Sequence, residues 1–235
     1  MIPPFFAPSD LKPIHTIVCD LDDTLYPESD YVRSGFRAVD RWMLSHLGVA
    51  GFARVAEGLF EEGVRGNTFD LALGRLGLAT DPSMISNLVE VYRSHFPDLM
   101  LPEETAKFLR EAVKRFRLAL VTDGYIGVQR RKVEALGIAS WFEAIVYTDQ
   151  WGRSCWKPHP AGFQHVMHVM PGEATGYVYL GDNPRKDFLA PRALGWGTVR
   201  VRRPNGEHAA YEPTRAEAAD GEVVTLAELG GVLGL

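Results

Sequence analysis

Short apolar runs alternate with longer amphipathic stretches through most of this chain of 235 residues. Five short runs, most of them apolar, predict buried strands at 14–19, 117–121, 144–147, 177–180 and 198–201. Helical patterns separate them at 102–116, 129–136, 159–170 and 184–194. Strands that alternate with helices of this length indicate the α/β class, in which a parallel sheet is covered on both faces.

The alternation stops directly after the first predicted strand, where only helical patterns follow. We predict about four helices, over 32–47, 50–62, 68–76 and 82–96. The domain prediction is therefore a core of residues 1–28 and 101–235 with a helical insert at 29–100. Because ligands of open α/β sheets bind at the carboxyl ends of the strands, we expect the insert to be a lid over that edge. The alternative is a bundle that only adds stability.

Composition and charge narrow the classes of partner. The formal net charge is -5, which argues against binding a nucleic-acid polymer or an anionic membrane through bulk charge. No apolar run reaches the roughly 18 residues that a membrane helix needs. The two cysteines form no disulfide framework, and residues 1–13 lack the apolar segment of a signal peptide. We therefore expect a cytoplasmic location.

Acidic residues follow the first predicted strand as Asp20, Asp22 and Asp23. Three carboxylates within four positions repel one another, and a divalent cation is the usual compensation. The ordinary alternative is an acidic turn after a strand.

Further polar groups end other predicted strands or precede a helix. Asp182 is expected in a strand-to-helix turn, and Asp187 one turn into the helix that follows. Thr122, with the backbone N–H groups of the adjacent Asp-Gly turn, has the chemistry to hold phosphate oxygens. Lys157 precedes a proline. Each feature also has a plain structural explanation: a helix-dipole acid, a tight turn or a surface lysine. We expect Arg200 to lie at the solvent-exposed end of a strand.

Taken together, these motifs resemble the haloacid dehalogenase (HAD) superfamily of phosphohydrolases over roughly Ile14 to Val201. The family pattern is D-x-D-x-T, then a strand ending in Thr or Ser, then a Lys, then G-D-x-x-x-x-D. The matching segments are 20–24, 117–122, 157 and 181–187. The resemblance implies a Rossmann-like core, a helical cap of the C1 type, and a helical turn with a hairpin flap over 21–30.

The resemblance also implies catalytic roles. Asp20 would attack phosphorus to form an aspartyl phosphate, and Asp22 would act as general acid and then as general base. A protonated Asp22 beside an ionised Asp20 is the expectation for the first step. Mg²⁺ would be held by the Asp20 carboxylate, the backbone carbonyl of Asp22, and Asp182, with Asp187 orienting waters or binding directly.

Substrate contacts are implied in the same way. Thr122, the N–H groups of Asp123 and Gly124, and Lys157 would hold the phosphoryl group. Arg33 and Arg37, one helical turn apart in the insert, are further candidates for contact with substrate. The expected ligand is a small phosphorylated metabolite.

The segment 122–125 with Gln129 and Lys132 also looks like that of bacterial and fungal nucleotidases in this superfamily. A pyrimidine nucleoside monophosphate is therefore the first substrate class we expect, and a sugar phosphate is the second.

Two other functions remain open at this level. One is a phosphomutase or phosphotransferase of the same superfamily, which also keeps both acids of the first motif. The other is a catalytically silent binding module on this fold, although no motif is broken. The chain is expected to be a monomer or a homodimer.

Overall fold

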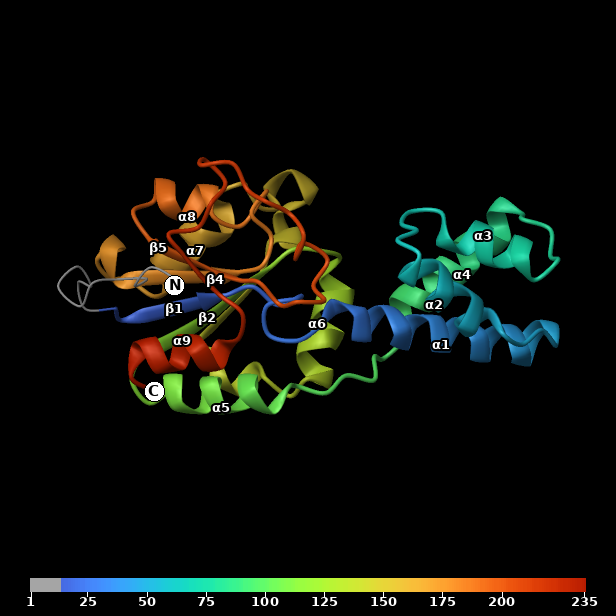
Figure 1. Ribbon diagram of the computed structural model, residues 1–235, viewed down its shortest axis with the longest axis horizontal. Helices are drawn as coiled ribbons and strands as arrows, with labels where there is room; N and C mark the ends of the chain where they lie inside the picture. The colour runs from blue at the N-terminus through green and yellow to red at the C-terminus, as the bar shows by residue number, and fades with distance from the viewer. Residues whose placement is uncertain (1–13) are drawn as a thin grey trace. The chain divides into compact units, whose positions relative to one another are not determined.

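The computed structural model describes residues 14–235, which include a parallel sheet of six strands (Figure 1). The strands are β1 (Thr16–Cys19), β2 (Arg117–Thr122), β3 (Ala144–Tyr147), β4 (Tyr177–Gly181), β5 (Gly197–Val201) and β6 (Gly221–Val223). They lie in the order β3-β2-β1-β4-β5-β6, and every neighbouring pair is parallel. The carboxyl ends of all these strands therefore meet at one edge of the sheet.

Strand β1 lies near the middle of the sheet, between β2 and β4. Cys19 is opposite Leu120 on one side and Leu180 on the other, and all of β1 is buried. Burial on both faces explains why the sequence shows a continuous apolar run here rather than an alternation. The residue that follows, Asp20, leaves the sheet at the centre of its carboxyl edge.

Helices cover both faces of the sheet. α5 (Glu103–Ala112) and α9 (Leu226–Leu233) lie on one face, and α7 (Ala161–Val169) and α8 (Leu189–Ala193) on the other (Figure 1). α6 (Ile126–Ala135) follows β2, and four 3₁₀ turns lie at Ala139–Trp141, Thr148–Trp151, Arg153–Cys155 and Ala174–Gly176. This arrangement confirms the predicted α/β, Rossmann-like fold.

Most of the segment between β1 and β2 forms a separate compact unit, Ser29–Leu99. Its helices are α1 (Glu28–Leu47), α2 (Phe52–Glu61), α3 (Thr68–Arg75) and α4 (Pro82–Ser94). They enclose an apolar core that includes Phe36, Met43 and Leu59. The other unit ends at Glu28, resumes at Met100 and runs to Leu235. We call these the helical unit and the α/β unit. The lid role of the helical unit stays a prediction.

Three local features differ from the sequence expectations. β6 and α9 were not predicted, because the run 221–223 is too short to stand out. The predicted helix 184–194 exists only as α8, since residues 184–188 form turns. The expected flap over 21–30 is reduced to a single bridge between Asp22 and Tyr26, and α1 already begins at Glu28.

Candidate active site

Three of the predicted site residues leave the sheet at its carboxyl edge. Asp20 directly follows β1, Thr122 is the last residue of β2, and Asp182 directly follows β4. Parallel pairing places β1 between β2 and β4, so these side chains reach the same region. The topology brings together residues that are about 160 positions apart in the chain.

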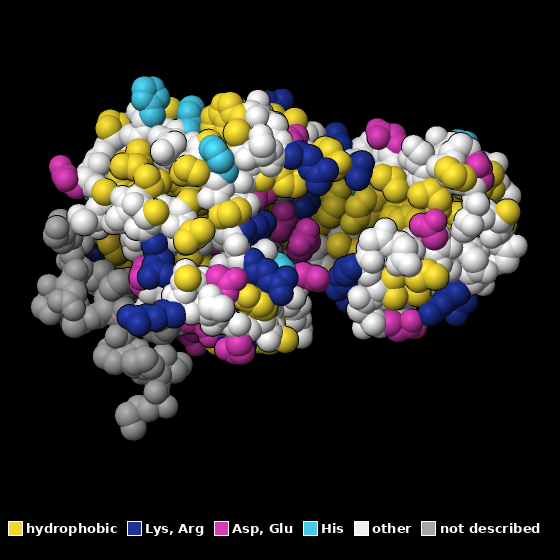
Figure 2. Space-filling model, turned by 90° about the horizontal axis from the view of Figure 1, so that it is seen from above, with side chains coloured by type: hydrophobic (Ala, Val, Ile, Leu, Met, Phe, Trp, Pro, Cys, Tyr) yellow, Lys and Arg dark blue, Asp and Glu magenta, His cyan; other side chains and the backbone are white. Residues whose placement is uncertain are grey.

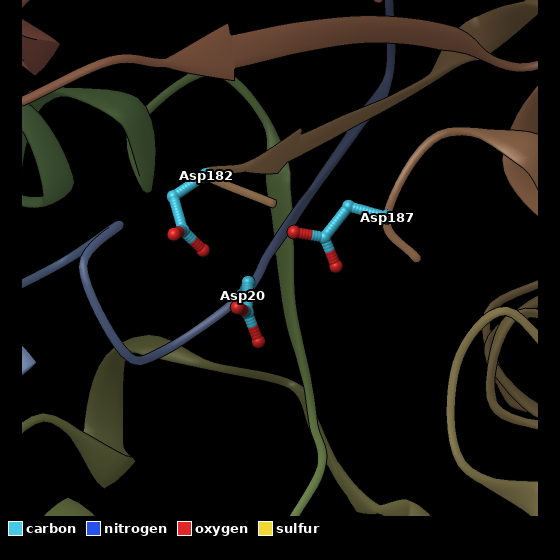
Figure 3. Close-up of side chains that lie close together, drawn as sticks. All are labelled: Asp20, Asp182 and Asp187. Carbon is cyan, nitrogen blue, oxygen red and sulfur yellow. The ribbon is translucent and has the colours of Figure 1, made fainter. Parts of the chain in front are cut away.

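A cluster of three buried carboxylates forms at this edge, made of Asp20, Asp182 and Asp187. One oxygen from each lies within 4.8 Å of the others. Figure 3 shows the three side chains turned toward a common space, although Asp20 is far in sequence from the turn that carries Asp182 and Asp187. Carboxylate oxygens are the ligands that Mg²⁺ and Ca²⁺ prefer, so the donor set fits a hard divalent cation.

Lys157 neutralises part of this cluster. Its Nζ lies 2.7 Å from Oδ1 of Asp20 and 2.8 Å from Oδ1 of Asp187, and it donates to the hydroxyl of Tyr179 at 2.8 Å. Burial alone would lower the pKa of Lys157, but attraction to Asp187 and Asp20 raises it well above its usual range. Lys157 is therefore a fixed positive charge beside Asp20.

Asp187 lies in the turn before α8, not one turn into a helix as predicted. Its carboxylate accepts the backbone N–H of Asn183 at 2.9 Å, which closes the turn before a helix can start. The turn also packs closely on β4, because a Cβ at Gly181 would meet Oδ2 of Asp187 at 2.6 Å. The glycine of the G-D-x-x-x-x-D motif thus leaves room for the second acid.

The carboxylate of Asp22 lies outside the three-acid cluster and is held by other side chains. Oδ1 pairs with Nζ of Lys132 at 2.7 Å and accepts the hydroxyl of Tyr26 at 2.5 Å, and Oδ2 accepts Nε2 of Gln129 at 2.9 Å. Burial acts to raise the pKa of Asp22, but attraction to Lys132 and these hydrogen bonds bring it below its usual value. The structure therefore holds Asp22 ionised, which differs from the protonated Asp22 expected for the first step.

Asp23, the third acid of the first motif, accepts hydrogen bonds from backbone N–H groups. Its Oδ1 accepts the N–H of Glu28 and its Oδ2 accepts the N–H of Glu207, both at 2.8 Å. It adopts a left-handed conformation with φ of 52°, which Asp tolerates better than most residues. Asp23 thereby ties the start of α1 to the loop after β5.

The turn after β2 connects to the loop of Lys157. The carboxylate of Asp123 accepts the hydroxyl of Thr148 at 2.7 Å and the backbone N–H of Lys157 at 3.1 Å. The hydroxyl of Thr122 accepts Nε2 of Gln129 at 2.6 Å. Gly124 has φ of 114°, which favours glycine at the tip of this turn.

Burial and mutual repulsion shape the titration of the remaining acids. Burial raises the pKa of Asp20 to about 6, despite the attraction of Lys157. Burial, followed by the charges of Asp187 and Asp20, raises the pKa of Asp182 well above its usual range. The pKa of Asp187 is lowered instead, because attraction to Lys157 and Lys186 outweighs the effect of burial. An excess of negative charge therefore remains around Asp182, where a bound cation would be stabilised.

A cavity of about 230 Å³ opens beside these residues within the α/β unit. Its lining combines the predicted residues with others: Asp20, Asp22, Glu28, Asp123, Gly124, Trp156, Lys157, Asp182, Asn183, Lys186 and His208. Sequence reasoning missed Glu28, Lys186 and His208. The position of Lys186 next to Asp187 was a usable signal, whereas nothing in the sequence marks His208. Burial and the nearby Asp22 raise the pKa of Glu28 to about 7.

Arg200 supports the cluster from behind, which corrects the expectation of a solvated strand end. The residue is 2% exposed. Its Nε donates to the backbone carbonyl of Asp182 at 3.3 Å and its Nη2 to that of His208 at 2.6 Å. These contacts fix the backbone of one predicted metal ligand and of one cavity residue.

Arg33 and Arg37 belong to the helical unit and make ion pairs there. Arg33 lies 3.9 Å from Asp30 and 3.8 Å from Glu61, and Arg37 lies 3.6 Å from Asp98. All of these side chains are more than a third exposed, so the pairs contribute little to stability. Their expected contact with substrate stays a prediction.

Comparisons with known proteins point in one direction. Residues 17–201 match the family model described as haloacid dehalogenase-like hydrolase. A glyceraldehyde 3-phosphate phosphatase of Methanopyrus kandleri is 30% identical over 85% of this chain and 88% of its own. A phosphoserine phosphatase of Thermus thermophilus is 34% identical over 59% of this chain and 55% of its own.

Solved structures agree on the fold. YfnB of Bacillus subtilis, determined with magnesium bound, superposes with a TM-score of 0.67 at 18% identity and covers 95% of this chain and 100% of its own. Across the described residues 14–235, no helix has the length and apolar character needed to cross a membrane.

Proposed function

Because the chain belongs to the haloacid dehalogenase-like hydrolases, we propose that it is a magnesium-dependent phosphomonoester hydrolase that works through an aspartyl phosphate on Asp20. The observation that carries this proposal is the buried constellation at the end of β1. Asp20 lies 2.7 Å from the amine of Lys157 and shares its site with Asp182 and Asp187. Lys157 offsets only part of the negative charge of these three buried acids, so a bound cation would stabilise the cluster.

Asp20 is the nucleophile in this proposal. One of its carboxylate oxygens forms a bond to phosphorus while the bond from phosphorus to the leaving oxygen breaks. With a pKa of about 6, Asp20 is ionised at neutral pH, as a nucleophile must be. Lys157, fixed by Asp187 and Tyr179, offsets the negative charge that otherwise keeps two anions apart.

Mg²⁺ would be held by the carboxylates of Asp20 and Asp182, with the backbone carbonyl of Asp22 as a further ligand. Asp187 is already engaged by Lys157 and by the N–H of Asn183, which suits a role in orienting the other ligands. When bound, Mg²⁺ supplies positive charge that offsets the phosphoryl oxygens and Asp20.

Asp22 is the general acid and the general base in this proposal. For the first step Asp22 must take up a proton, which it then gives to the leaving oxygen as that bond breaks, and in the second step it takes one from the water that attacks the aspartyl phosphate. The ionised state held in the structure is the form required for the second of these steps. Thr122 and the N–H groups of Asp123 and Gly124 would bind the phosphoryl oxygens at the end of β2.

The substrate we propose is a small polar phosphomonoester, with a sugar phosphate favoured over a pyrimidine nucleoside monophosphate. Two observations support this choice. The relatives described above are named for glyceraldehyde 3-phosphate and for phosphoserine. The cavity lining is almost entirely charged or polar, and among the described residues that line it Trp156 is the one large apolar side chain. A nucleobase would find few apolar partners there.

The test is a phosphate-release assay on a panel of sugar, amino-acid and nucleoside monophosphates, with Mg²⁺ and with excess chelator. We expect release that depends on Mg²⁺ and that Asp20→Asn abolishes, while circular dichroism shows that the variant stays folded. Asn keeps the size of Asp, so a loss of about 10³-fold or more reports on chemistry.

Other outcomes of this assay would change the assignment. An isomerised sugar phosphate in place of free phosphate would indicate a mutase. The absence of any turnover across the panel, with intact folding, would favour a silent binding module. Wild-type turnover in Asp20→Asn would end the proposed mechanism.

A further inference from the structure

Three side chains hold the carboxylate of Asp22. Lys132 and Tyr26 both contact its Oδ1, and Gln129 contacts its Oδ2. Both carboxylate oxygens are therefore engaged, from two directions, which fixes the rotation of the side chain as well as its position. Two of the three partners come from α6.

The two partners on α6 are themselves buried, at 1% exposure for Gln129 and 3% for Lys132. They are three positions apart, so they lie on the same face of the helix. Burying an amide and an ammonium group costs free energy that hydrogen bonds and an opposite charge must offset. The ion pair with Asp22 is thus a built contact, unlike the exposed pairs of the molecular surface.

Gln129 also connects Asp22 to the predicted phosphate site. The same Nε2 that donates to Asp22 donates to the hydroxyl of Thr122 at 2.6 Å. The carboxylate of Asp22 and the hydroxyl of Thr122 therefore lie within the span of two hydrogen bonds. Gly124 lies beside this link, since a Cβ there would be in van der Waals contact with Cδ of Gln129 at 3.4 Å.

From this geometry we propose that Lys132 and Gln129 are positioning residues for Asp22, an inference that rests on the proposed function. They hold the carboxylate at a fixed orientation beside the phosphoryl group, so that proton transfer to the leaving oxygen and from the attacking water meets a preset geometry. Proton transfer depends on such placement within hydrogen-bond reach. Neither residue touches the reacting atoms, and each acts through Asp22.

The leaving group provides a readout that a purely structural role would not move. An alkyl phosphate expels a poor leaving group, which needs a proton as the bond breaks. p-Nitrophenyl phosphate expels a stable phenolate, which needs little help. Misplacing Asp22 therefore slows the alkyl ester selectively, whereas general damage to the site slows both esters alike.

The experiment compares kcat for glycerol phosphate and p-nitrophenyl phosphate in the full chain with Mg²⁺. We expect Lys132→Met to lower kcat for the alkyl ester about tenfold more than for the aryl ester, with KM little changed, because general acid catalysis contributes about 10²–10⁴-fold. Lys132→Arg should recover part of the ratio. The matched control is Arg130→Met, which removes an exposed positive charge from the same helix and should leave the ratio unchanged.

A second variant covers the case in which Lys132→Met does not fold. Gln129→Met keeps the length of the side chain and should shift the ratio in the same direction. Equal losses on both esters, or no loss, in a folded variant of either residue would overturn the positioning role. Failure of the wild-type protein to release phosphate from either ester would instead count against the proposed function itself.

Discussion

The two units of the molecule differ in what they bury. Within residues 29–99, all of which the structure describes, the buried polar side chains are Ser34 and Thr68, and the rest of the core is apolar. Charged residues of that unit form exposed pairs such as Arg75 with Glu62 at 2.7 Å. This pattern is what hydrophobic burial alone would produce.

The α/β unit buries several full charges in addition to an apolar core. Asp20, Lys157, Asp182, Asp187 and Arg200 are each at most 9% exposed. Moving such groups out of water costs several kcal/mol each, and replacing them by well-packed apolar residues is often neutral or stabilising. Their presence at one edge of the sheet is therefore better explained by chemistry than by stability. Four predictions test this contrast.

The largest effect is expected from Lys157→Met. The change leaves Asp20 and Asp187 buried without their shared cation, which should lower the free energy of unfolding by about 3–5 kcal/mol. Urea denaturation of the metal-free protein measures it. Lys114→Met is the matched control, because Lys114 lies 2.7 Å from Glu111 but is 61% exposed, and it should cost about 1 kcal/mol or less. Equal losses in the two variants would contradict the contrast.

A smaller loss of stability is expected from Leu59→Ala in the helical unit. Leu59 is 1% exposed, so the change leaves a cavity worth about 3 kcal/mol. Hydrogen exchange should accelerate mainly in residues 29–99, while β1 and β4 keep their protection. Leu71, which is 41% exposed in the same unit, provides the control as Leu71→Ala. Uniform acceleration through both units would show that they unfold together.

The third effect in order of size is the stabilisation of the α/β unit by bound magnesium. Binding to the native state at a concentration of about 100 times Kd adds about 2.7 kcal/mol. Thermal melts with MgCl₂, against NaCl of equal ionic strength, measure this gain. Asp182→Asn should reduce the gain, and Leu59→Ala should retain it. A gain of the same size with NaCl would point to general screening.

The fourth prediction is a pH dependence of the metal-free protein. Glu28 and Asp20 have folded pKa values of about 7 and about 6, against ordinary values of 4.5 and 3.8. The native state therefore binds more protons than the unfolded chain between about pH 4 and pH 7, and stability should fall as pH rises through this window.

The pH dependence is checked by urea midpoints in chelator at pH 5 and pH 7.5. The combined variant Asp20→Asn and Glu28→Gln should flatten the change between the two midpoints. If the stability of the combined variant fell as steeply with pH as that of the wild type, groups other than Asp20 and Glu28 would be responsible for the pH dependence.

The local pattern of the sequence determined the α/β class, the helical segment after the first strand, and the acids at strand ends. Asp20 and Asp182 can be predicted because an apolar run indicates a buried strand. The residue that follows such a strand lies at the carboxyl edge of the sheet. Parallel pairing follows from the alternation of strands and helices. These inferences depend only on residues that lie within a few positions of one another in the sequence.

Tertiary structure alone decided which charges meet across the fold. Nothing around positions 129 and 132 of α6 reveals that Asp22, more than a hundred positions away, lies against them. The burial of Arg200 and the place of His208 in the cavity depend likewise on how the loop after β5 returns to the sheet. A helical or strand pattern shows that a side chain faces inward, but the partner that offsets its charge is set by segments that are distant in sequence and adjacent only after folding.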